Sequence, residues 1–383
     1  MLIDITRGLG LLLEGRVHTG LDRVGLAYLA RYGARATALV RYAGRWICLD
    51  GADSRKLFDA LLESDFSAAP AMRLLIARGI ALHWARARAM LMLNTDYTGL
   101  DLPAYAATVG ARGLRPLFFL HDLLPITHPE FFRSGEDRRH YARLHTICSG
   151  TGLLVTNSAA TRAALQKEAG RSRWTLPPLV VAPIAPARLP LAEGQRSIAQ
   201  PYFVVLGTIE PRKNHLLLLH LWRDIVAQFG DNSPRLVIIG QRGWECEQIV
   251  DILERSAALR GFVLEQPRCT DAQLSTWLHH AQALLFPSFA EGYGLPLVEA
   301  LSQGLPVIAS NLPVFREIAG NIPEYVDPLD GPRWRQLILE YSQTPSPARQ
   351  AQLERMRGYV PPTWDEHFAI VDDLIARVMH SAA

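Results

Sequence analysis

Two glutamates on either side of a glycine-rich turn are the residues of this chain best suited to bind a ligand. Glu291 precedes Gly292 and Gly294, and Glu299 follows them on a predicted helix. Where such a turn leads into a helix, free backbone amides and the helix dipole converge, so a phosphate can sit there. A carboxylate can accept hydrogen bonds from neighbouring hydroxyls. A phosphate framed by two hydroxyl-binding carboxylates indicates a nucleotide-sugar.

The elements that must position these glutamates can be predicted from the surrounding residues 281–310. The apolar run Ala283–Phe286 predicts a short buried strand, and Val307–Ala309 predicts a second one. Pro296 suits a first helical turn, where the missing amide would have no partner, so a helix is predicted over Leu295–Gln303. A strand, a turn and a helix therefore follow one another in the order that an anion site needs.

A second loop supplies positive charge. Arg212 and Lys213 lie in the segment Gly207–Asn214, directly after the predicted strand Tyr202–Leu206. Ligands of open α/β sheets bind beyond the carboxyl ends of strands, so this loop is well placed. A diphosphate that leaves a sugar gains negative charge, which positioned cations stabilise more strongly in the transition state than in the ground state. For the Arg–Lys pair alone, a solvated surface charge is an equal alternative.

Four segments of the chain resemble one enzyme family. They are GTIEPRKNH at 207–215, FPSFAEGYGLPLVEALSQGLPVIAS at 286–310, FLHDLLPITHPEFF at 119–132 and TNSAATRAAL at 156–165. Together they resemble the retaining, nucleotide-sugar-dependent glycosyltransferases of family four, which have the GT-B fold. The resemblance implies two Rossmann-like α/β/α domains that face each other across a cleft, with a C-terminal helix that crosses back to the N-terminal domain.

The resemblance implies roles for residues in the second half of the chain. Lys213, with Arg212, would stabilise the leaving diphosphate, Glu299 would bind the ribose, and Glu291 would face the transferred sugar. The turn residues expected to meet the sugar hydroxyls and the distal phosphate are Gly292, Tyr293, Gly294 and Leu295.

Two further positions, Thr208 and Cys269, are assigned to the donor site by the resemblance. Thr208 stands where many family members carry an arginine, and this departure leaves the division of labour between Arg212 and Lys213 open. Cys269 aligns with a position whose main chain meets the nucleobase. A buried, inert cysteine is the alternative interpretation of Cys269.

The first half of the chain carries a smaller set of candidates. His121 and Asp122 follow the predicted strand Pro116–Leu120, so they too lie at the carboxyl end of a strand. The resemblance makes His121 a contact of the donor sugar and diphosphate, whereas a lone histidine is usually a satisfied structural residue. Gly20 and Arg23 belong to a segment that resembles the family's N-terminal glycine loop, which lies near the acceptor or a phosphate. Asp122 is assigned to the same acceptor or phosphate site.

The resemblance also implies a mechanism, namely front-face substitution with retention at the anomeric carbon. An oxocarbenium-like centre forms, and the departing phosphate oxygen takes the acceptor's proton. No Asp-x-Asp motif precedes a strand, so side-chain cations and helix amides are expected in place of a metal ion. No cofactor is expected, because the nucleotide-sugar is a substrate. Retaining hydrolases would need two carboxyl groups straddling one bond, and the sequence offers no case for such a pair.

Composition bounds the class of protein. The chain has 383 residues, enough for two ordinary domains, and 40 basic residues against 37 acidic ones give a formal net charge of +3. That balance argues against nucleic-acid binding. The four cysteines have no paired metal-ligand spacing, which favours reduced thiols in a cytosol. Because the sequence contains neither an apolar run of about 18 residues nor a segment like a signal peptide, a cytoplasmic protein is expected.

Short apolar strands alternate with amphipathic helices, which predicts α/β layers with mostly parallel sheets. The predicted strands are Leu2–Ile5, Ala36–Val40, Met90–Leu93, Pro116–Leu120, Leu153–Thr156, Tyr202–Leu206, Arg235–Ile239, Phe262–Leu264, Ala283–Phe286 and Val307–Ala309. The proline-rich stretch 183–201 predicts a boundary between an acceptor-binding domain, 1–195, and a donor-binding domain, 200–358. A last helix is predicted over 363–380, and the resemblance assigns it to the N-terminal domain. A helix that stays on its own domain is the alternative.

An arginine-rich region interrupts the first half, where residues 66–95 include no acidic side chain. Its arginines, interspersed with leucines and a tryptophan, are Arg73, Arg78, Arg86 and Arg88. Basic amphipathic helices can lie on anionic membranes, so one hypothesis is a peripheral contact with the inner face of the cytoplasmic membrane, near a lipid-linked acceptor. The alternative is an ordinary core-facing helix with its arginines in solvent.

The favoured function is a retaining hexosyltransferase of the mannosyltransferase-like branch, acting in the synthesis of bacterial surface polysaccharide. GDP-mannose is the first donor to test, and a glycan or lipid-linked saccharide is the expected acceptor. The main alternative is the same reaction with a UDP- or dTDP-sugar such as glucose or rhamnose. Two other classes compete, a nucleotide-sugar epimerase of similar fold and a non-enzymatic scaffold. The intact GYGLP segment disfavours the epimerase, and the joint presence of Lys213, Glu291 and Glu299 disfavours the scaffold.

Overall fold

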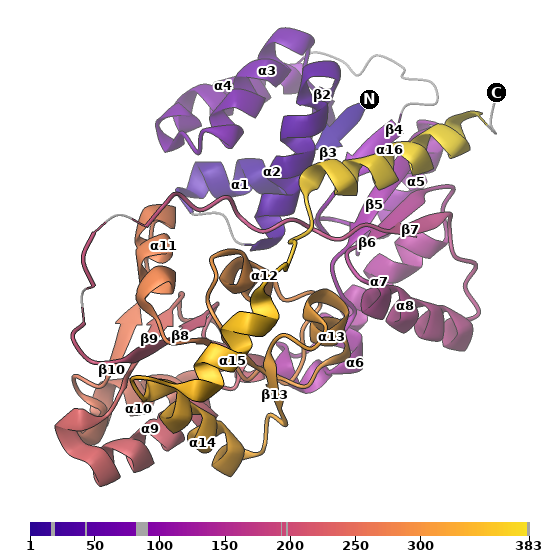
Figure 1. Cartoon of the computed structure of the whole chain (residues 1–383). Coiled ribbons are helices and arrows are strands. Elements are labelled where there is room, and N and C mark those ends of the chain that lie inside the picture. The colour runs from indigo at the N-terminus through magenta and orange to yellow at the C-terminus, as the bar shows by residue number, and fades with distance from the viewer. Residues whose placement is uncertain (17–19, 43, 82–90, 193, 197, 381–383) are drawn as a thin grey trace. The chain divides into compact units, whose positions relative to one another are not determined.

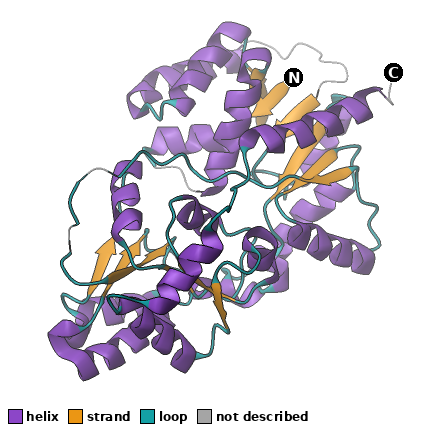
Figure 2. Ribbon diagram, viewed as in Figure 1, coloured by secondary structure: helices purple, strands orange, loops and turns teal. Residues whose placement is uncertain are grey.

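The computed structural model describes residues 1–16, 20–42, 44–81, 91–192, 194–196 and 198–380. The chain divides into two compact units. Unit 1 consists of Met1–Ile126, Gly135–Ile184 and Trp364–Ala383, and unit 2 consists of Thr127–Ser134 and Ala185–Thr363. Each unit has its own sheet flanked by helices (Figures 1 and 2). The assignment of acceptor and donor binding to the ranges 1–195 and 200–358 stays a prediction.

The sheet of unit 1 has seven strands in the order β3-β2-β1-β4-β5-β6-β7. Neighbouring strands run parallel except β2 and β3, which form an antiparallel hairpin. The strands are β1 (Leu2–Asp4), β2 (Thr37–Tyr42), β3 (Arg45–Cys48), β4 (Leu91–Asn94), β5 (Arg115–Leu120), β6 (Leu153–Thr156) and β7 (Leu179–Val181). The described α-helices that begin in this unit are α1 (Thr6–Glu14), α2 (Gly20–Tyr32), α3 (Gly51–Leu62), α4 (Ala69–Ala81), α5 (Pro103–Ala111), α6 (Leu124–Thr127), α7 (Glu136–Cys148), α8 (Ala159–Ser172) and α16 (Trp364–His380).

The sheet of unit 2 has six strands in the order β10-β9-β8-β11-β12-β13, all parallel. The strands are β8 (Tyr202–Leu206), β9 (Arg235–Ile239), β10 (Val263–Gln266), β11 (Leu284–Phe286), β12 (Val307–Ser310) and β13 (Glu324–Val326). The described α-helices of this unit are α9 (His215–Phe229), α10 (Glu247–Arg255), α11 (Asp271–His280), α12 (Leu295–Ser302), α13 (Pro313–Ala319), α14 (Gly331–Ser342) and α15 (Pro347–Met356). Two parallel α/β units confirm the predicted fold class.

Both sheets reverse their strand order after the first strand. In unit 1 the reversal lies between β1 and β4, and in unit 2 it lies between β8 and β11. At such a switch point the connections leave in opposite directions and open a crevice beyond the carboxyl ends of the strands, where ligands of doubly wound folds bind. Each unit therefore offers one preferred place for a ligand.

The strands predicted from the sequence are all present among the described residues, although Met90, the first residue of one of them, falls outside that range; β3, β7 and β13 were not predicted. Inner parallel strands are buried on both faces and read as continuous apolar runs, as in β8 and β9. The three missed strands lie at sheet edges, where polar residues and neighbouring prolines interrupt the apolar pattern.

Helix α16 belongs to unit 1, where it packs against β6 and β7 (Figure 1). Phe368 lies edge-on to Tyr28, with ring centroids 5.1 Å apart. The carboxylate of Asp372 accepts hydrogen bonds from Arg31 at 2.7 Å and from the hydroxyl of Tyr32 at 2.9 Å. The helix predicted over 363–380 is therefore present, and its apolar face completes the core of unit 1.

Candidate active site

The candidate site of unit 2 lies at its switch point. Strands β8 and β11 are hydrogen-bonded neighbours, with Leu284 opposite Val204. Because parallel strands end at the same edge of a sheet, the loops 207–214 and 287–294 emerge side by side. The backbone amide of Phe289 donates to the carbonyl of Arg212 at 2.8 Å and joins the two loops.

Arg212, Lys213 and Glu291 form one ion-pair cluster at this edge. The ammonium of Lys213 lies 2.5 Å from Oε1 of Glu291, and Nη1 of Arg212 lies 2.7 Å from Oε2. The side chains of Lys213 and Glu291 are only 8% and 7% exposed. The structure therefore brings together three of the predicted site residues, from two loops that are nearly eighty positions apart in the chain.

Two residues that the sequence analysis did not single out complete the cluster. Glu210, which is 2% exposed, accepts from Nε of Arg212 at 2.7 Å. The hydroxyl of Ser288 donates to Oε1 of Glu291 at 2.7 Å. Both lie inside the segments that carry the family resemblance. Because they follow the predicted strands closely, the same rule that selected Lys213 and Glu291 could have selected them.

Burial and pairing set the proton affinities in the cluster. Burial alone would raise the pKa of Glu291, but Arg212 and Lys213 outweigh it and lower the pKa to about 2. Burial lowers the pKa of Lys213 despite the opposing charge of Glu291, and burial raises the pKa of Glu210 despite its neighbouring cations. Two cations and two carboxylates nearly cancel, so an incoming anion must exchange with a carboxylate rather than meet unpaired positive charge.

Glycines allow the backbone to approach this cluster closely. Gly207 has φ 135°, and a Cβ there would lie 3.4 Å from Cε of Lys213. Gly294 has φ 110° at the N-terminus of α12, and a Cβ there would come within 2.7 Å of the Phe315 ring. Only glycine combines this backbone conformation with so little space.

The predicted helix over Leu295–Gln303 is α12, and its N-terminus opens directly after the turn. Leu295 begins the helix, and Tyr293 and Glu299 are buried. Among the described residues the amide of Leu295 donates to no protein acceptor, as is usual for the first turn of a helix. Glu299 lies more than one turn into the helix, so the structure places it on the element that follows the cluster.

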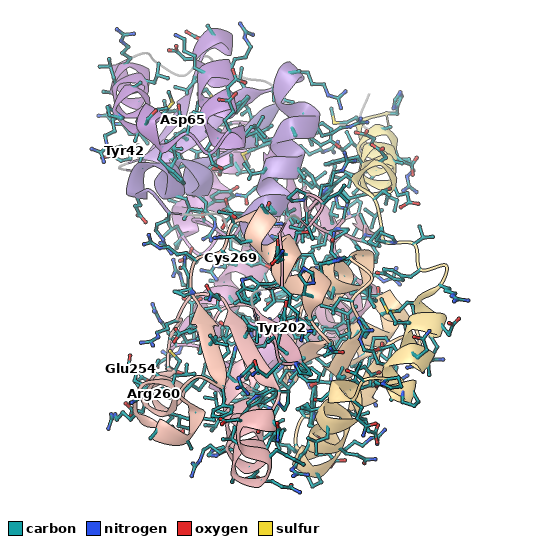
Figure 3. The ribbon with its side chains drawn as sticks, turned by 60° about the vertical axis from the view of Figure 1, so that its left-hand side comes forward. Tyr42, Asp65, Tyr202, Glu254, Arg260 and Cys269 are labelled. Carbon is teal, nitrogen blue, oxygen red and sulfur yellow. The ribbon has the colours of Figure 1, made fainter. Side chains whose placement is uncertain are left out.

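Thr208 and Cys269 lie farther along the same sheet edge. A Cβ at Gly243 would come within 2.7 Å of the methyl group of Thr208, so Thr208 packs on the loop after β9. Cys269, labelled in Figure 3, follows β10. It is half-buried, and burial, together with Asp271, raises the pKa of its thiol. A thiol with a raised pKa is mostly protonated at neutral pH, so its side chain is not suited to bind an anion.

Two candidate residues of unit 1, His121 and Asp122, lie beyond the carboxyl end of β5, and the other two, Gly20 and Arg23, lie on α2. The ring Nε2 of His121 lies 2.8 Å from the carbonyl oxygen of Thr95, and burial lowers the pKa of this histidine. A neutral imidazole must therefore donate through Nε2, which leaves Nδ1 as its acceptor. The carboxylate of Asp122 accepts from the amide of Leu124 at 2.9 Å and so caps α6. Gly20 begins α2, with Arg23 in its first turn.

Comparison with known proteins gives this arrangement its context. Residues 193–322 match the family model described as "Glycosyl transferases group 1". This part of the chain is therefore similar to a group 1 glycosyltransferase domain. The matched region includes the complete cluster, from Glu210 to Glu291, and the helix that carries Glu299.

Curated relatives of this chain include two proteins of Escherichia coli. The serotype-specific mannosyltransferase WbdA is 29% identical over 60% of this chain and 30% of WbdA. The O-antigen chain mannosyltransferase B is 29% identical over 56% of this chain and 58% of that protein. The chain thus matches about a third of the length of WbdA and somewhat more than half of the second relative.

Solved structures share the fold along the whole chain. The crystal structure of Anabaena HepE in complex with UDP aligns with a TM-score of 0.64 over 99% of both chains, at 18% identity. A trehalose-phosphate synthase (UDP-forming) from Burkholderia vietnamiensis aligns with a TM-score of 0.60 over 99% of this chain and 84% of that one, at 13% identity. This likeness confirms the predicted GT-B fold.

A short segment of unit 2 contacts the region that matches the family model, although it lies far from that region in sequence. Residues 127–134 group with unit 2, and the ring of Phe131 stacks on that of Phe289 with centroids 5.4 Å apart. The indole nitrogen of Trp244 donates to the carbonyl of Phe131 at 3.1 Å. The segment therefore supports the loop that carries Glu291, a function that the sequence motif alone did not predict.

The described part of the chain contains neither a group of metal ligands nor a helix that could cross a membrane. Across residues 1–380, outside the gaps given above, no group of three His, Cys, Asp or Glu side chains is arranged to hold a metal ion. Over the same residues no helix has both the length and the apolar composition that a bilayer crossing requires. Of the arginine-rich region, Arg73 and Arg78 lie on α4, whereas Arg86 and Arg88 fall outside the described residues.

Proposed function

We propose that this chain is a retaining glycosyltransferase that transfers mannose from GDP-mannose to a glycan or lipid-linked saccharide in bacterial surface polysaccharide synthesis. The observation that carries the proposal is the buried cluster of Arg212, Lys213 and Glu291 at the switch point of unit 2. The names of the E. coli relatives support mannosyl transfer and polysaccharide synthesis.

The proposed reaction breaks the bond between the anomeric carbon and the donor's phosphate oxygen and forms a bond from the same face to an acceptor hydroxyl. The acceptor's proton passes to the departing phosphate. Lys213 and Arg212 stabilise the growing negative charge of the diphosphate, together with the amides at the start of α12. Glu291, released from the cations as the diphosphate arrives, faces the sugar and its positive anomeric centre. Glu299 binds the ribose.

The cations and helix amides act in place of a metal ion in this proposal. Transfer should therefore persist in excess EDTA at its rate in untreated buffer. A strict requirement for Mg²⁺ or Mn²⁺ would contradict this part of the mechanism.

The donor nucleotide is the first quantity to measure. GDP, UDP and dTDP are compared by thermal shift, because a ligand that binds only the folded state raises the melting temperature by mass action. We expect the largest shift with GDP, followed by mannose transfer from GDP-mannose to glycan acceptors. A larger shift with UDP or dTDP would favour a glucosyl or rhamnosyl donor, and the absence of a shift with all three would contradict the donor site.

We also propose a peripheral contact with anionic membranes through α4. This helix buries Met72, Leu75 and Ile76 and exposes Arg73 and Leu74. An exposed leucine beside arginines suits an interface in which the apolar group enters the lipid and the cations meet headgroups. Flotation with vesicles that contain roughly 30% anionic lipid should recover the wild type but not Leu74→Glu. Equal recovery of both, or of neither, would contradict the contact.

A further inference from the structure

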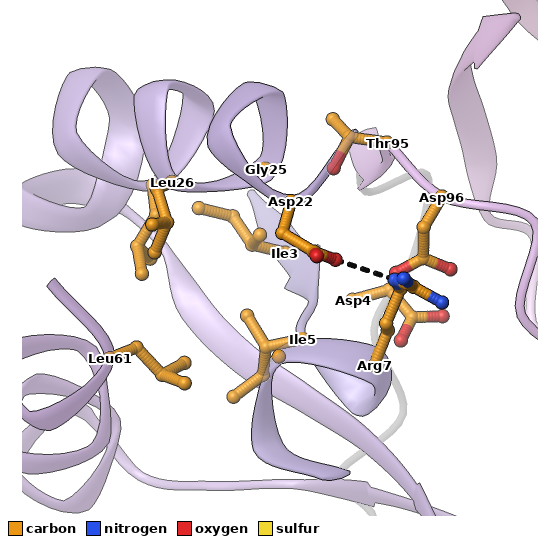
Figure 4. Close-up of a pocket in the computed structure, with 12 residues that line it drawn as sticks. Ile3, Asp4, Ile5, Arg7, Asp22, Gly25, Leu26, Leu61, Thr95 and Asp96 are labelled. Atoms are coloured by element: carbon orange, nitrogen blue, oxygen red, sulfur yellow. Dashed lines mark hydrogen bonds and ion pairs between the residues drawn. The ribbon is translucent and has the colours of Figure 1, made fainter. Parts of the chain in front are cut away.

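A hollow in unit 1 lies at the second switch point of the molecule, outside the glycosyltransferase donor cluster. Its walls come from β1, the start of α1, the first half of α2 and residue Leu29, the end of α3, and the loop after β4 (Figure 4). Polar side chains gather at one end, and they are Asp4, Arg7, Asp22, Thr95 and Asp96. The other end is apolar and is formed by Ile3, Ile5, Leu26, Leu29 and Leu61.

Two of the three carboxylates in the hollow have a guanidinium partner. Asp4 accepts from Nε of Arg41 at 2.8 Å and from both the amide and the hydroxyl of Thr6. Asp22 lies 2.6 Å from Nε of Arg7, as the dashed line in Figure 4 shows. The burial of these two carboxylates is therefore compensated by their ion pairs.

Asp96 has no such partner among the described residues, although it is only 9% exposed. Its Oδ1 accepts from the amide of Thr98 at 2.7 Å, and no cation of the described chain lies within ion-pair distance of its carboxylate. Burial first, and then the charge of Asp4, raise the pKa of Asp96 to about 6, while Thr98 and Arg41 oppose the shift. A carboxylate kept this buried without a counter-charge is costly, and such residues gather at functional sites.

The size and polarity of the hollow define what it can take. Its volume is about 40 Å³, room for roughly three waters, so it admits an edge of a ring rather than a whole pyranose. An apolar wall suits the C–H groups of a sugar, and a carboxylate suits its hydroxyls. A phosphate would face three carboxylates, so the hollow disfavours anionic groups.

We propose that this hollow binds the acceptor, with the carboxylate of Asp96 accepting hydrogen bonds from hydroxyls of a neutral sugar whose C–H edge contacts Ile5 and Leu26. The inference rests on the proposed function, because a transferase needs a second substrate site besides the donor cluster. It adds the residue that recognises the acceptor and the chemical class that is accepted.

The test measures the binding of neutral glycosides to the full chain without any nucleotide. Saturation-transfer NMR is recorded with methyl glycosides of mannose, glucose, galactose, rhamnose and N-acetylglucosamine, which bear hydroxyls but no charge. Asp96→Asn keeps an oxygen for the Thr98 amide, and Asp96→Ala removes it. Asp59→Asn, an exposed carboxylate on α3 of the same unit, is the matched control.

We expect at least one glycoside to bind the wild type and Asp59→Asn alike, and to bind both Asp96 variants about tenfold or more weakly. The nucleotide thermal shift of Asp96→Asn should equal that of the wild type, which separates this site from the donor site. The proposal is overturned if no glycoside binds the wild type, if Asp96→Asn binds as well as the wild type, or if it loses the nucleotide shift. Glycoside binding without any nucleotide shift would contradict the proposed donor and leave the acceptor hollow supported.

Discussion

The first six strands of each sheet follow the same order, yet the buried carboxylates at the two switch points have opposite environments. In unit 2, Glu291 faces two cations and its pKa falls to about 2. In unit 1, Asp96 has no ion-pair partner in the described chain and its pKa rises to about 6. A balanced cluster can exchange one anion for another, whereas a lone carboxylate can satisfy itself with neutral hydroxyls. The strand order of a sheet therefore determines where a ligand binds, whereas the charges of the neighbouring side chains determine whether that ligand is anionic or neutral.

The largest expected effect comes from removing the central cation of the paired cluster. Lys213→Ala should lower kcat by about 100- to 1000-fold, because a charge that stabilises the leaving diphosphate acts mainly in the transition state. Steady-state transfer rates check this. Lys167→Ala, which removes an exposed lysine of α8, is the control and should leave the rate unchanged. A rate near that of the wild type for Lys213→Ala would take Lys213 out of the reaction.

Breaking the paired carboxylate should destabilise unit 2. Glu291→Gln leaves Arg212 and Lys213 buried with less counter-charge, at a cost of about 3 kcal/mol at neutral pH. Since the folded-state pKa lies below the ordinary value of about 4.3, this stabilisation is present above about pH 4.5 and is lost as the pH falls toward about 2. Denaturant unfolding of the wild type and of Glu291→Gln at pH 7 and at pH 3 measures the difference in the free energy of unfolding at each pH. If Glu291→Gln is as stable as the wild type at pH 7, the ion pairs of Glu291 with Arg212 and Lys213 do not stabilise unit 2.

Removing the helix carboxylate should affect binding more than the chemical step. Glu299→Ala should weaken the affinity for the donor nucleotide by about 10- to 100-fold, because hydrogen bonds to a charged group are lost. Calorimetric titration of the nucleotide is the direct measurement, with Glu247→Ala on the exposed face of α10 as control. If nucleotide affinity stays the same while kcat falls, the ribose role is wrong.

The contribution of Asp96 to stability should change with pH in the opposite direction to that of Glu291. Because the folded-state pKa of Asp96 is raised, its relative contribution to stability is greatest at low pH and is lost as the pH rises through about 6. Asp96→Asn should therefore be more stable than the wild type at pH 7.5, by on the order of 1 kcal/mol, and no more stable at pH 4. Melting curves at the two pH values test this. A variant that melts earlier at pH 7.5 would show that Asp96 is structural.

The smallest effect concerns the segment that supports the Glu291 loop. Phe131→Ala removes the stack on Phe289, worth about 1 kcal/mol, and should raise the KM for the donor by roughly fivefold. Kinetics at saturating acceptor give the value, with Phe229→Ala at the exposed end of α9 as control. If both variants behave alike, the stack does not position the loop.

The sequence was sufficient to predict the inner strands and to select Arg212, Lys213 and Glu291 as candidate site residues, but not to predict that they form ion pairs with one another. Buried parallel strands such as Tyr202–Leu206 must be continuously apolar, so composition alone reveals them. Lys213 and Glu291 lie beside strand ends in segments with a family resemblance, and the sheet then brings them together.

Other features depend on three-dimensional neighbours that the sequence does not show. Asp4 lies near the end of the predicted strand Leu2–Ile5 and Asp96 follows the predicted strand Met90–Leu93, so the rule of carboxyl ends could have selected both as candidates. What it could not supply is that Asp4 meets Arg41 while Asp96 pairs with no cation of the described chain, because Arg41 comes from a different strand. The packing of Phe131 on Phe289 was hidden in the same way, since it joins segments more than 150 residues apart.

The return of α16 to unit 1 means that residues 185–363 form an insertion whose two ends leave and re-enter the same body. His367 contacts the carbonyls of Ala182 and Pro183, so the point of exit and the point of re-entry are tied to each other. An engineered chimera could therefore exchange the inserted stretch as a cassette between these anchored ends, whereas a chain truncated after Ile184 would expose Tyr28 and Tyr32 and be prone to aggregate.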